Sequence, residues 1–277
     1  METIVIVGDA HSNSTLGLCP RGVELEEGRT HTPTDTQKWL WDCWLEFCDF
    51  VPNRGVTSFF NGDWVDGDIR FRTHQVISRN PGDIIDMGID NALPLVDKSD
   101  RVFFLKGTRS HAGKSAWLET QVAKDFDNTV MNEYDKPVWE RFYGEFGGVV
   151  FDIKHFGSLG YRPWTLPNSL NAMAVEIELN ASKSGERLPD LVVRNHRHRH
   201  ADSGDNYRTR VIANYAWQGM TEYANDITNT PPDIGGLIVN CEGGEYELIK
   251  KHYPVRPRKL WTIPFGKKTL MGIFQKK

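Results

Sequence analysis

Short apolar runs of strand length recur along the chain and alternate with amphipathic segments. We predict strands buried on both faces at 3–7, 56–60, 101–105, 148–153, 191–193, 211–213 and 236–239. Amphipathic segments predict helices at 35–50, 114–126 and 165–179. The stretch 240–249 predicts a hairpin that turns at Gly243-Gly244. Strands that alternate with helices, followed by a strand-rich end, indicate an α/β fold.

Chain length and composition narrow the class of protein. The 277 residues are enough for one large domain, and we expect a single domain over 1–277. No apolar run is long enough for a transmembrane helix, and the start lacks the features of a signal peptide, so we expect a cytoplasmic protein. The four cysteines form no C-x-x-C pair, which indicates buried thiols in place of disulfides or a zinc site.

Positive charge is concentrated at the end of the chain. The segment 250–277 contains nine Lys or Arg and no Asp or Glu, although the whole chain has a net charge of -4. Aromatic residues, such as Trp261 and Phe265, are interspersed with these charges. Such a segment is suited to tracking a polyanion and stacking on bases. Packing of a final strand and tail against an acidic body explains it equally well.

Asp or His follows five of the predicted strands. They are Asp9 and His11, then Asp63 and Asp66, then His111, then His155, and last the alternating His196, His198 and His200. Open α/β sheets place their sites at the carboxyl ends of the strands. Carboxylate and imidazole together are ligands for divalent metal ions, and these residues are too many for one tetrahedral site. Two ions about 3.5–4 Å apart, bridged by one carboxylate, would use them all.

The order of these motifs resembles the signature of the calcineurin-like metallophosphoesterases. The chain has "GDAH", "GDWVD", "GTRSH", an isolated His and "NHRH", where that family has D-x-H, G-D-x-x-D, G-N-H-[DE], H and G-H-x-H. The resemblance runs from residue 9 to about residue 200. It implies a four-layer α/β/β/α sandwich of two mixed sheets. The stretches 18–28 and 107–111 are also similar to family members carried by bacteriophages.

The resemblance also implies a set of ligands for two divalent ions, with manganese expected first and iron, zinc, nickel or magnesium as alternatives. One ion is expected on Asp9, His11, Asp63 and His198, and the second on Asp63, His155 and His196. Asp63 would bridge the two ions. For Asp66 we expect a place behind the ligands, orienting an imidazole, with an ordinary turn residue as the alternative. For His155 the alternative is a core histidine satisfied by hydrogen bonds.

The third motif departs from the family pattern. Thr108 stands where the family has a metal-binding Asn, and the nearest histidine is His111. Three interpretations stay open: His111 is a ligand, His111 is a general acid, or the second site is weak or empty. Arg109 beside it is a candidate for binding substrate phosphate, as is Arg162 in the loop after His155. A solvated arginine is the ordinary alternative for both.

Two registers fit the segment "VRNHRHRHAD". Asn195 takes the place of the family's Gly, which favours His196 and His198 as ligands and leaves His200 spare. If the segment is extended, Arg197 and Arg199 face away from the metals. Residues 16–56 predict an inserted loop and a Trp-rich helix near the site.

The expected function is metal-dependent hydrolysis of phosphodiesters in nucleic acid or nucleotides, by a hydroxide activated between two ions. DNA or RNA is therefore a candidate partner. Hydrolysis of phosphomonoesters, including phosphoproteins, is the alternative within the enzyme class. A non-catalytic binding module, in which metal is only structural, is the alternative outside it.

Overall fold

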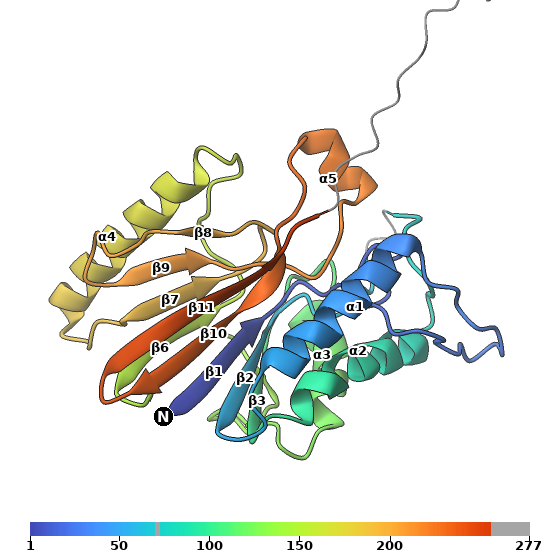
Figure 1. The fold of residues 1–277 in the computed structure, drawn as a ribbon, viewed down its shortest axis with the longest axis horizontal. Coiled ribbons are helices and arrows are strands. Elements are labelled where there is room, and N and C mark those ends of the chain that lie inside the picture. Colours follow the sequence, from blue (N-terminus) through green and yellow to red (C-terminus); the bar gives the residue numbers. More distant parts are fainter. Residues whose placement is uncertain (70–72, 256–277) are drawn as a thin grey trace, which may run out of the picture.

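Two mixed β-sheets form the centre of the protein in the computed structural model, which describes residues 1–69 and 73–255 (Figure 1). The first sheet has the order β11-β10-β1-β2-β3-β4, with strands Glu245–Tyr253, Ile234–Glu242, Glu2–Val7, Val56–Asn61, Arg101–Leu105 and Val138–Trp139. The second has the order β5-β6-β7-β9-β8, with strands Phe142–Phe146, Val149–Lys154, Leu191–Arg194, Arg210–Ala213 and Ala201–Asp202. Parallel pairing joins β1, β2, β3 and β4, and also β6, β7 and β9.

Helices cover the outer face of each sheet, and the inner faces pack on each other. Helices α1 (Asp35–Phe50), α2 (Pro81–Val96) and α3 (Trp117–Lys124) lie on the first sheet, and α4 (Leu166–Ser184) lies on the second (Figure 1). Alternate side chains of β1 serve both interfaces, because Val5 and Val7 face the helices while Ile4 and Ile6 face the second sheet. The predicted fold class, a four-layer sandwich of two mixed sheets, is therefore confirmed.

The seven predicted strands are present, and the hairpin turns at Gly243 and Gly244, both with positive φ. Helix α1 begins at a capping box between Thr34 and Gln37. The third predicted helix runs on to Ser184, where Gly185 ends it in the left-handed conformation. A short 3-10 turn, η1 (Lys114–Ala116), precedes α3.

Helix α2 was not predicted, and neither was the short helix α5 (Glu222–Ile227). Two glycines and Pro94 lower the helix propensity of α2. Tertiary packing explains the glycine at position 88. A Cβ on Gly88 would lie 2.7 Å from Val65 and 2.8 Å from Val122. The helix approaches these side chains so closely that only glycine fits.

The two chain segments singled out by composition have ordinary packing where they are described. Helix α1 is the crossover between parallel strands β1 and β2, and its Trp44 and Phe47 are fully buried on the sheet. In β11, Lys250 forms an ion pair with Asp202, and Tyr253 is buried. The rest of the basic segment, 256–277, lies outside the described residues. None of the helices in the described ranges has the length and apolarity needed to cross a bilayer.

Candidate metal centre

The carboxyl ends of β1, β2, β6 and β7 bring the predicted ligands together. Five of these residues, Asp9, His11, Asp63, His196 and His198, have φ between +46° and +74°. For non-glycine residues this conformation is costly, by about 1–3 kcal/mol each where it is strained, and it is concentrated at functional sites. Strands β1, β2 and β7 thus end in sharp turns that direct these side chains toward one another.

The first group consists of Asp9, His11 and His198. Nε2 of His198 lies 3.2 Å from Asp9 Oδ1 and 3.1 Å from Nε2 of His11. The distance between His11 Nε2 and Asp9 Oδ1 is 3.8 Å. Ligand atoms about 2.0–2.2 Å from one metal ion are roughly 3–3.8 Å apart in tetrahedral to octahedral sites. The three atoms therefore have the spacing of a shared cation.

A buried carboxylate oxygen without a hydrogen-bond partner supports a cation at this position. Asp9 is fully buried, yet its Oδ1 has no hydrogen bond among the described residues. Its other oxygen, Oδ2, accepts hydrogen bonds from Asn195 Nδ2 and the His196 backbone N–H, both at 3.0 Å. One carboxylate oxygen is thus held in place while the other is left directed at the histidines. A cation at that point would satisfy it.

The second group consists of Asp63, His155 and His196. His155 Nε2 lies 3.1 Å from Asp63 Oδ2, and His196 Nδ1 lies 3.8 Å from the same oxygen. His155 Nδ1 donates to the carbonyl oxygen of Asn61 at 2.7 Å. That hydrogen bond assigns the proton to Nδ1 and leaves the Nε2 lone pair available for a metal ion.

The two groups are adjacent, because Asp9 Oδ1 is also 4.0 Å from His155 Nε2. Asp63 belongs to the second group only, so its bridging role stays a prediction. Two glycines allow this crowding. A Cβ on Gly62 would lie 2.6 Å from the ring of His155, and one on Gly107 would lie 2.3 Å from Asp63. Side chains at these positions would displace the ligands.

Thr108 binds the Asp63 carboxylate. Its backbone N–H donates to Asp63 Oδ1 at 2.6 Å, and its hydroxyl lies 3.0 and 3.1 Å from the two carboxylate oxygens. The residue that stands in place of the family's Asn therefore positions a ligand.

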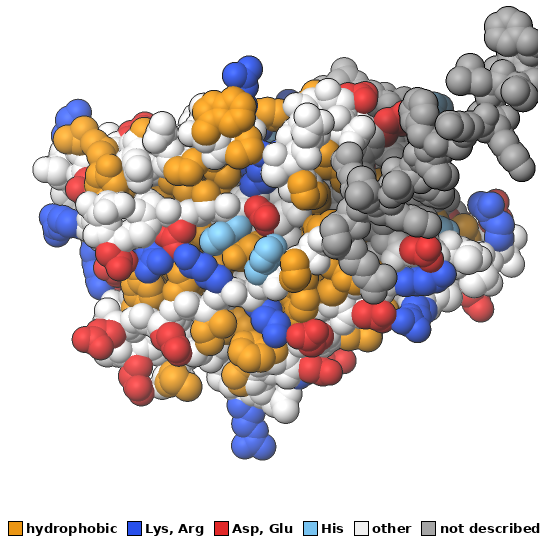
Figure 2. Space-filling model, turned by 45° about the horizontal axis from the view of Figure 1, so that its top comes forward, with side chains coloured by type: hydrophobic (Ala, Val, Ile, Leu, Met, Phe, Trp, Pro, Cys, Tyr) orange, Lys and Arg blue, Asp and Glu red, His pale blue; other side chains and the backbone are white. Residues whose placement is uncertain are grey.

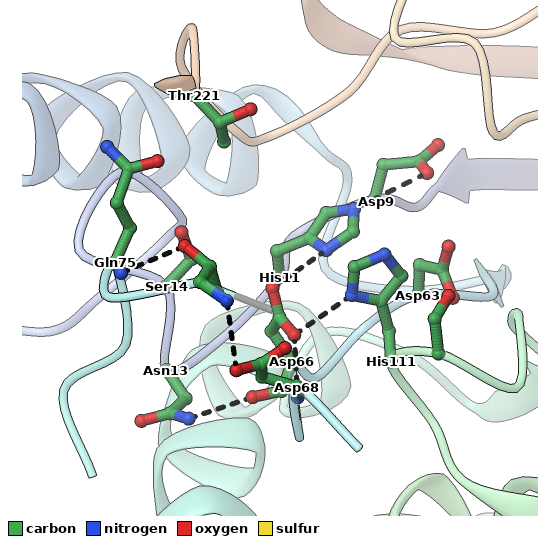
Figure 3. A network of polar contacts seen from close by, with 12 residues as sticks. Asp9, His11, Asn13, Ser14, Asp63, Asp66, Asp68, Gln75, His111 and Thr221 are labelled. Carbon is green, nitrogen blue, oxygen red and sulfur yellow. Dashed lines mark hydrogen bonds and ion pairs between the residues drawn. The ribbon is translucent and has the colours of Figure 1, made fainter. Parts of the chain in front are cut away.

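A third group contains His11, Asp66 and His111 (Figure 3). His111 Nδ1 lies 2.9 Å from Asp66 Oδ1, and His11 Nδ1 lies 3.6 Å from Asp66 Oδ2. Figure 3 shows both rings directed toward this carboxylate. The rings of His11 and His111 also meet edge to face at 4.5 Å. His111 is thus beside the first group and is absent from the second, which weighs against its replacing Asn as a second-site ligand.

Burial and neighbouring charges set the protonation of the centre. Burial alone would raise the pKa of Asp9 and Asp63, but the surrounding histidines hold both well below the usual range. Burial lowers the pKa of His198, which favours the neutral ligand form. For His11, burial is outweighed by Asp66 and Asp9, which raise its pKa to about 10. Asp63 and Asp9 likewise overcome burial and raise the pKa of His155 to about 9.

These shifts predict that metal binding releases protons. In the metal-free protein His11 and His155 are protonated at neutral pH, and a cation must displace those protons. Affinity for Mn(II) should therefore rise with pH until the pH passes these raised pKa values. Titration calorimetry at pH 6.5 and 8, in two buffers of different ionisation enthalpy, measures the Mn(II) affinity and the number of protons released. An affinity that does not change with pH, with no proton released, would contradict the assignment.

A cavity of about 460 Å³ opens onto the centre. Its lining includes His11, Asp63, His111, His196 and His198, and also Tyr161, Arg197, Arg199 and Tyr223. In the space-filling view, histidine, acidic and basic side chains gather on this face (Figure 2). None of the residues 16–56 lines the cavity within the described part of the chain, and the expected place of this segment near the site stays a prediction.

The two expected phosphate-binding arginines are elsewhere. Arg109 is exposed, and Arg162 is exposed with its guanidinium 5.5 Å from the ring of Trp164. Neither lines the cavity. Arg197 and Arg199 line it instead, so the condition on which they were expected to face away, an extended segment, is not met. The reason is the backbone, because positive φ at His196 and His198 removes the extended conformation on which that expectation depended.

His200 takes no part in the metal groups. Its ring stacks on Tyr215 with the centroids 4.2 Å apart, and Nδ1 is 3.0 Å from the carbonyl oxygen of Ala213. The preference for His196 and His198 over the other register agrees with this placement.

Buried residues that the sequence analysis did not identify support the ligands. Asn195 Oδ1 accepts from Asn61 Nδ2 at 2.7 Å and from Asn214 Nδ2 at 3.3 Å. Glu119 on α3 accepts from the backbone N–H of Gly107 at 2.8 Å and of Trp64 at 3.2 Å. These bonds join the ends of four strands. The available signal was an Asn at the end of each of two apolar strands, at Asn61 and Asn195.

No protein-family model matches the sequence, and no curated protein matches it. Solved structures with a similar fold include a dimetal phosphatase from Danio rerio, with 11% identity over 91% of this chain and 96% of that chain and a TM-score of 0.46. Vps29 from Entamoeba histolytica has 10% identity over 91% and 99%, with a TM-score of 0.43. A predicted phosphoesterase from Streptococcus pneumoniae has 10% identity over 90% and 98%, with a TM-score of 0.35. Likenesses this distant carry no conclusion about activity, and the bacteriophage resemblance stays a prediction.

Proposed function

We propose that the protein is a metal-dependent phosphoester hydrolase, and that its substrates are phosphodiesters in nucleic acid or nucleotides. One observation carries the proposal: two adjacent groups of carboxylate and imidazole ligands lie at a cavity that also presents arginine side chains. Carboxylate and imidazole suit divalent ions such as manganese, iron, zinc and nickel. When bound, a pair of such ions would polarise a phosphate oxygen and lower the pKa of water.

The side chains around the cations would divide the remaining work. Asp9 and Asp63, both ionised, supply the negative charge that keeps cations in a buried site. His111 is half-buried at the cavity, with Nδ1 on Asp66 and with no hydrogen bond to Nε2 among the described residues. An imidazole held in this way presents Nε2 to the substrate, where it can protonate a leaving oxygen.

A panel assay tests the proposal. Chelator-treated protein is supplied with Mn(II), Ni(II), Mg(II) or Zn(II) and given bis-p-nitrophenyl phosphate, p-nitrophenyl phosphate, or labelled DNA or RNA. We expect turnover of the diester that depends on added metal. Absence of turnover with every metal and substrate would reject the enzyme and favour a binding module. Activity on the monoester alone would remove the preference for diesters.

A further inference from the structure

Arg199 is a buried cation at the cavity, without a counterion among the described residues. The residue is 8% exposed, and its Nη1 is buried with no hydrogen-bond partner in that part of the chain. Its Nη2 donates to Thr228 Oγ1 at 2.5 Å and to the carbonyl oxygen of Thr230 at 3.2 Å, which fixes the guanidinium in place. No carboxylate in the described ranges forms an ion pair with it. A buried charge without a partner is costly, so its presence here calls for a ligand.

The undescribed segments do not supply a side-chain partner. Residues 70–72 and 256–277 contain no Asp or Glu. Three acidic side chains line the same cavity, and each has another partner. Asp63 contacts Thr108 and His155, Asp66 contacts His111, and Asp68 contacts Arg79. The Arg199 guanidinium is therefore left without an acidic side chain at this cavity among the described residues.

Arg197 adds a second cation to the same wall. Its Nε donates to the carbonyl oxygen of Leu159 at 3.2 Å, and its guanidinium lies 5.2 Å from the ring of Tyr161. No acidic residue in the described part of the chain is paired with it. Two arginines anchored by neutral groups, with charge left over, form a site for an anion such as phosphate.

The position of these arginines relates this site to the metal centre. Arg197 and Arg199 alternate with His196 and His198, one from each ligand group, and all four line one cavity. Tyr161 and Tyr223, which are 48% and 73% exposed, line it too. Exposed aromatic rings beside a basic wall suit a nucleobase between two phosphates.

We infer that Arg199, with Arg197, binds a second phosphate that is not hydrolysed, carried by a substrate whose scissile phosphodiester lies at the metal centre. The substrate class is a nucleotide that bears two phosphate groups. This inference rests on the proposed function for the hydrolytic step, but the anion site itself is independent of turnover. It also distinguishes the substrate from a simple ester with a single phosphate.

Two chromogenic esters test it directly. The p-nitrophenyl ester of thymidine 5′-phosphate and the same ester with an added 3′-phosphate release the same phenol from the same kind of diester. In the wild type, we expect the 3′-phosphate to raise kcat/KM by roughly 10- to 100-fold, the effect of hydrogen bonds between charged groups. In Arg199→Gln the ratio of kcat/KM between the two esters should fall to about three or less. The kcat/KM of the ester that lacks the 3′-phosphate should stay within about threefold of wild type.

The control variants separate charge from packing. Arg199→Lys keeps the charge and should retain part of the advantage, and Arg208→Gln removes an exposed arginine outside the cavity and should retain all of it. Equal kcat/KM for both esters in the wild type, or an unchanged ratio in Arg199→Gln, would overturn the inference. So would an equal loss on both esters. If Arg199→Gln lowers the melting temperature enough to unfold the protein, Arg197→Gln provides the same comparison.

A binding measurement distinguishes failure of the inference from failure of the proposed function. Thymidine 3′,5′-bisphosphate is titrated by calorimetry into metal-loaded wild type and Arg199→Gln. If neither ester is turned over, the hydrolase proposal fails, yet an affinity at least tenfold weaker in the variant still supports the anion site. Equal affinities would reject the anion site, whatever the activity of the protein.

Discussion

Asp63→Asn should reduce kcat/KM at least about 10³-fold on every phosphoester substrate and should lower the amount of bound metal. The carboxylate is 1% exposed, and Oδ2 lies 3.1 Å from His155 Nε2. Asn has the same shape but no charge, and its amide is held by the hydrogen bonds from Thr108 that now bind Asp63. The variant therefore keeps the packing of the centre and removes the charge that attracts a cation.

Metal analysis after dialysis, together with kcat/KM on bis-p-nitrophenyl phosphate, measures both effects. Asp190→Asn is the matched control, because Asp190 also accepts a backbone N–H, from Val150 at 2.7 Å, but precedes β7 at the opposite end from the ligands. That control should keep its metal and its rate. A wild-type metal content in Asp63→Asn, with a rate within tenfold of wild type, would refute the assignment.

The parts of the site that could be predicted depend on buried strands. Parallel strands covered on both faces appear as continuous apolar runs, so the residue after each run can be placed at a sheet edge from sequence alone. That reasoning located Asp9, Asp63 and His155, which the structure brings together. It also placed Asp66 behind the ligands, where it contacts His111.

The parts that could not be predicted depend on backbone turns and on packing between distant segments. Alternation along an extended segment puts neighbours on opposite faces, but the left-handed turns at His196 and His198 bring Arg197 and Arg199 to the cavity as well. The support of Asp9 by Asn195 joins residues 186 positions apart in the chain. No local pattern carries information about such a contact.

The single domain and the cytoplasmic location stay predictions. The single-domain expectation for 1–277 is a hypothesis about a chain whose last 22 residues are outside the described ranges.

His111→Ala should lower kcat by about 10²-fold or more on a dinucleotide while leaving the bound metal unchanged, because general acid catalysis contributes factors of this size. The geometry behind this expectation is the pair of His111 Nδ1 and Asp66 Oδ1 at 2.9 Å, which orients the ring and leaves Nε2 for the leaving oxygen. The alternative is that His111 is a metal ligand, and the two roles differ in how they depend on the leaving group.

An alkoxide leaving group from a dinucleotide needs a proton, whereas p-nitrophenolate leaves without one. A general acid therefore predicts a large loss on the dinucleotide and a loss of less than about tenfold on bis-p-nitrophenyl phosphate. A ligand predicts equal losses on both substrates and a loss of metal. Equal losses with one metal equivalent missing would reject the general acid. Because His111 is half-buried and its side-chain interactions within the described part of the chain are with Asp66 and the ring of His11, the variant should stay folded, so either outcome assigns the role.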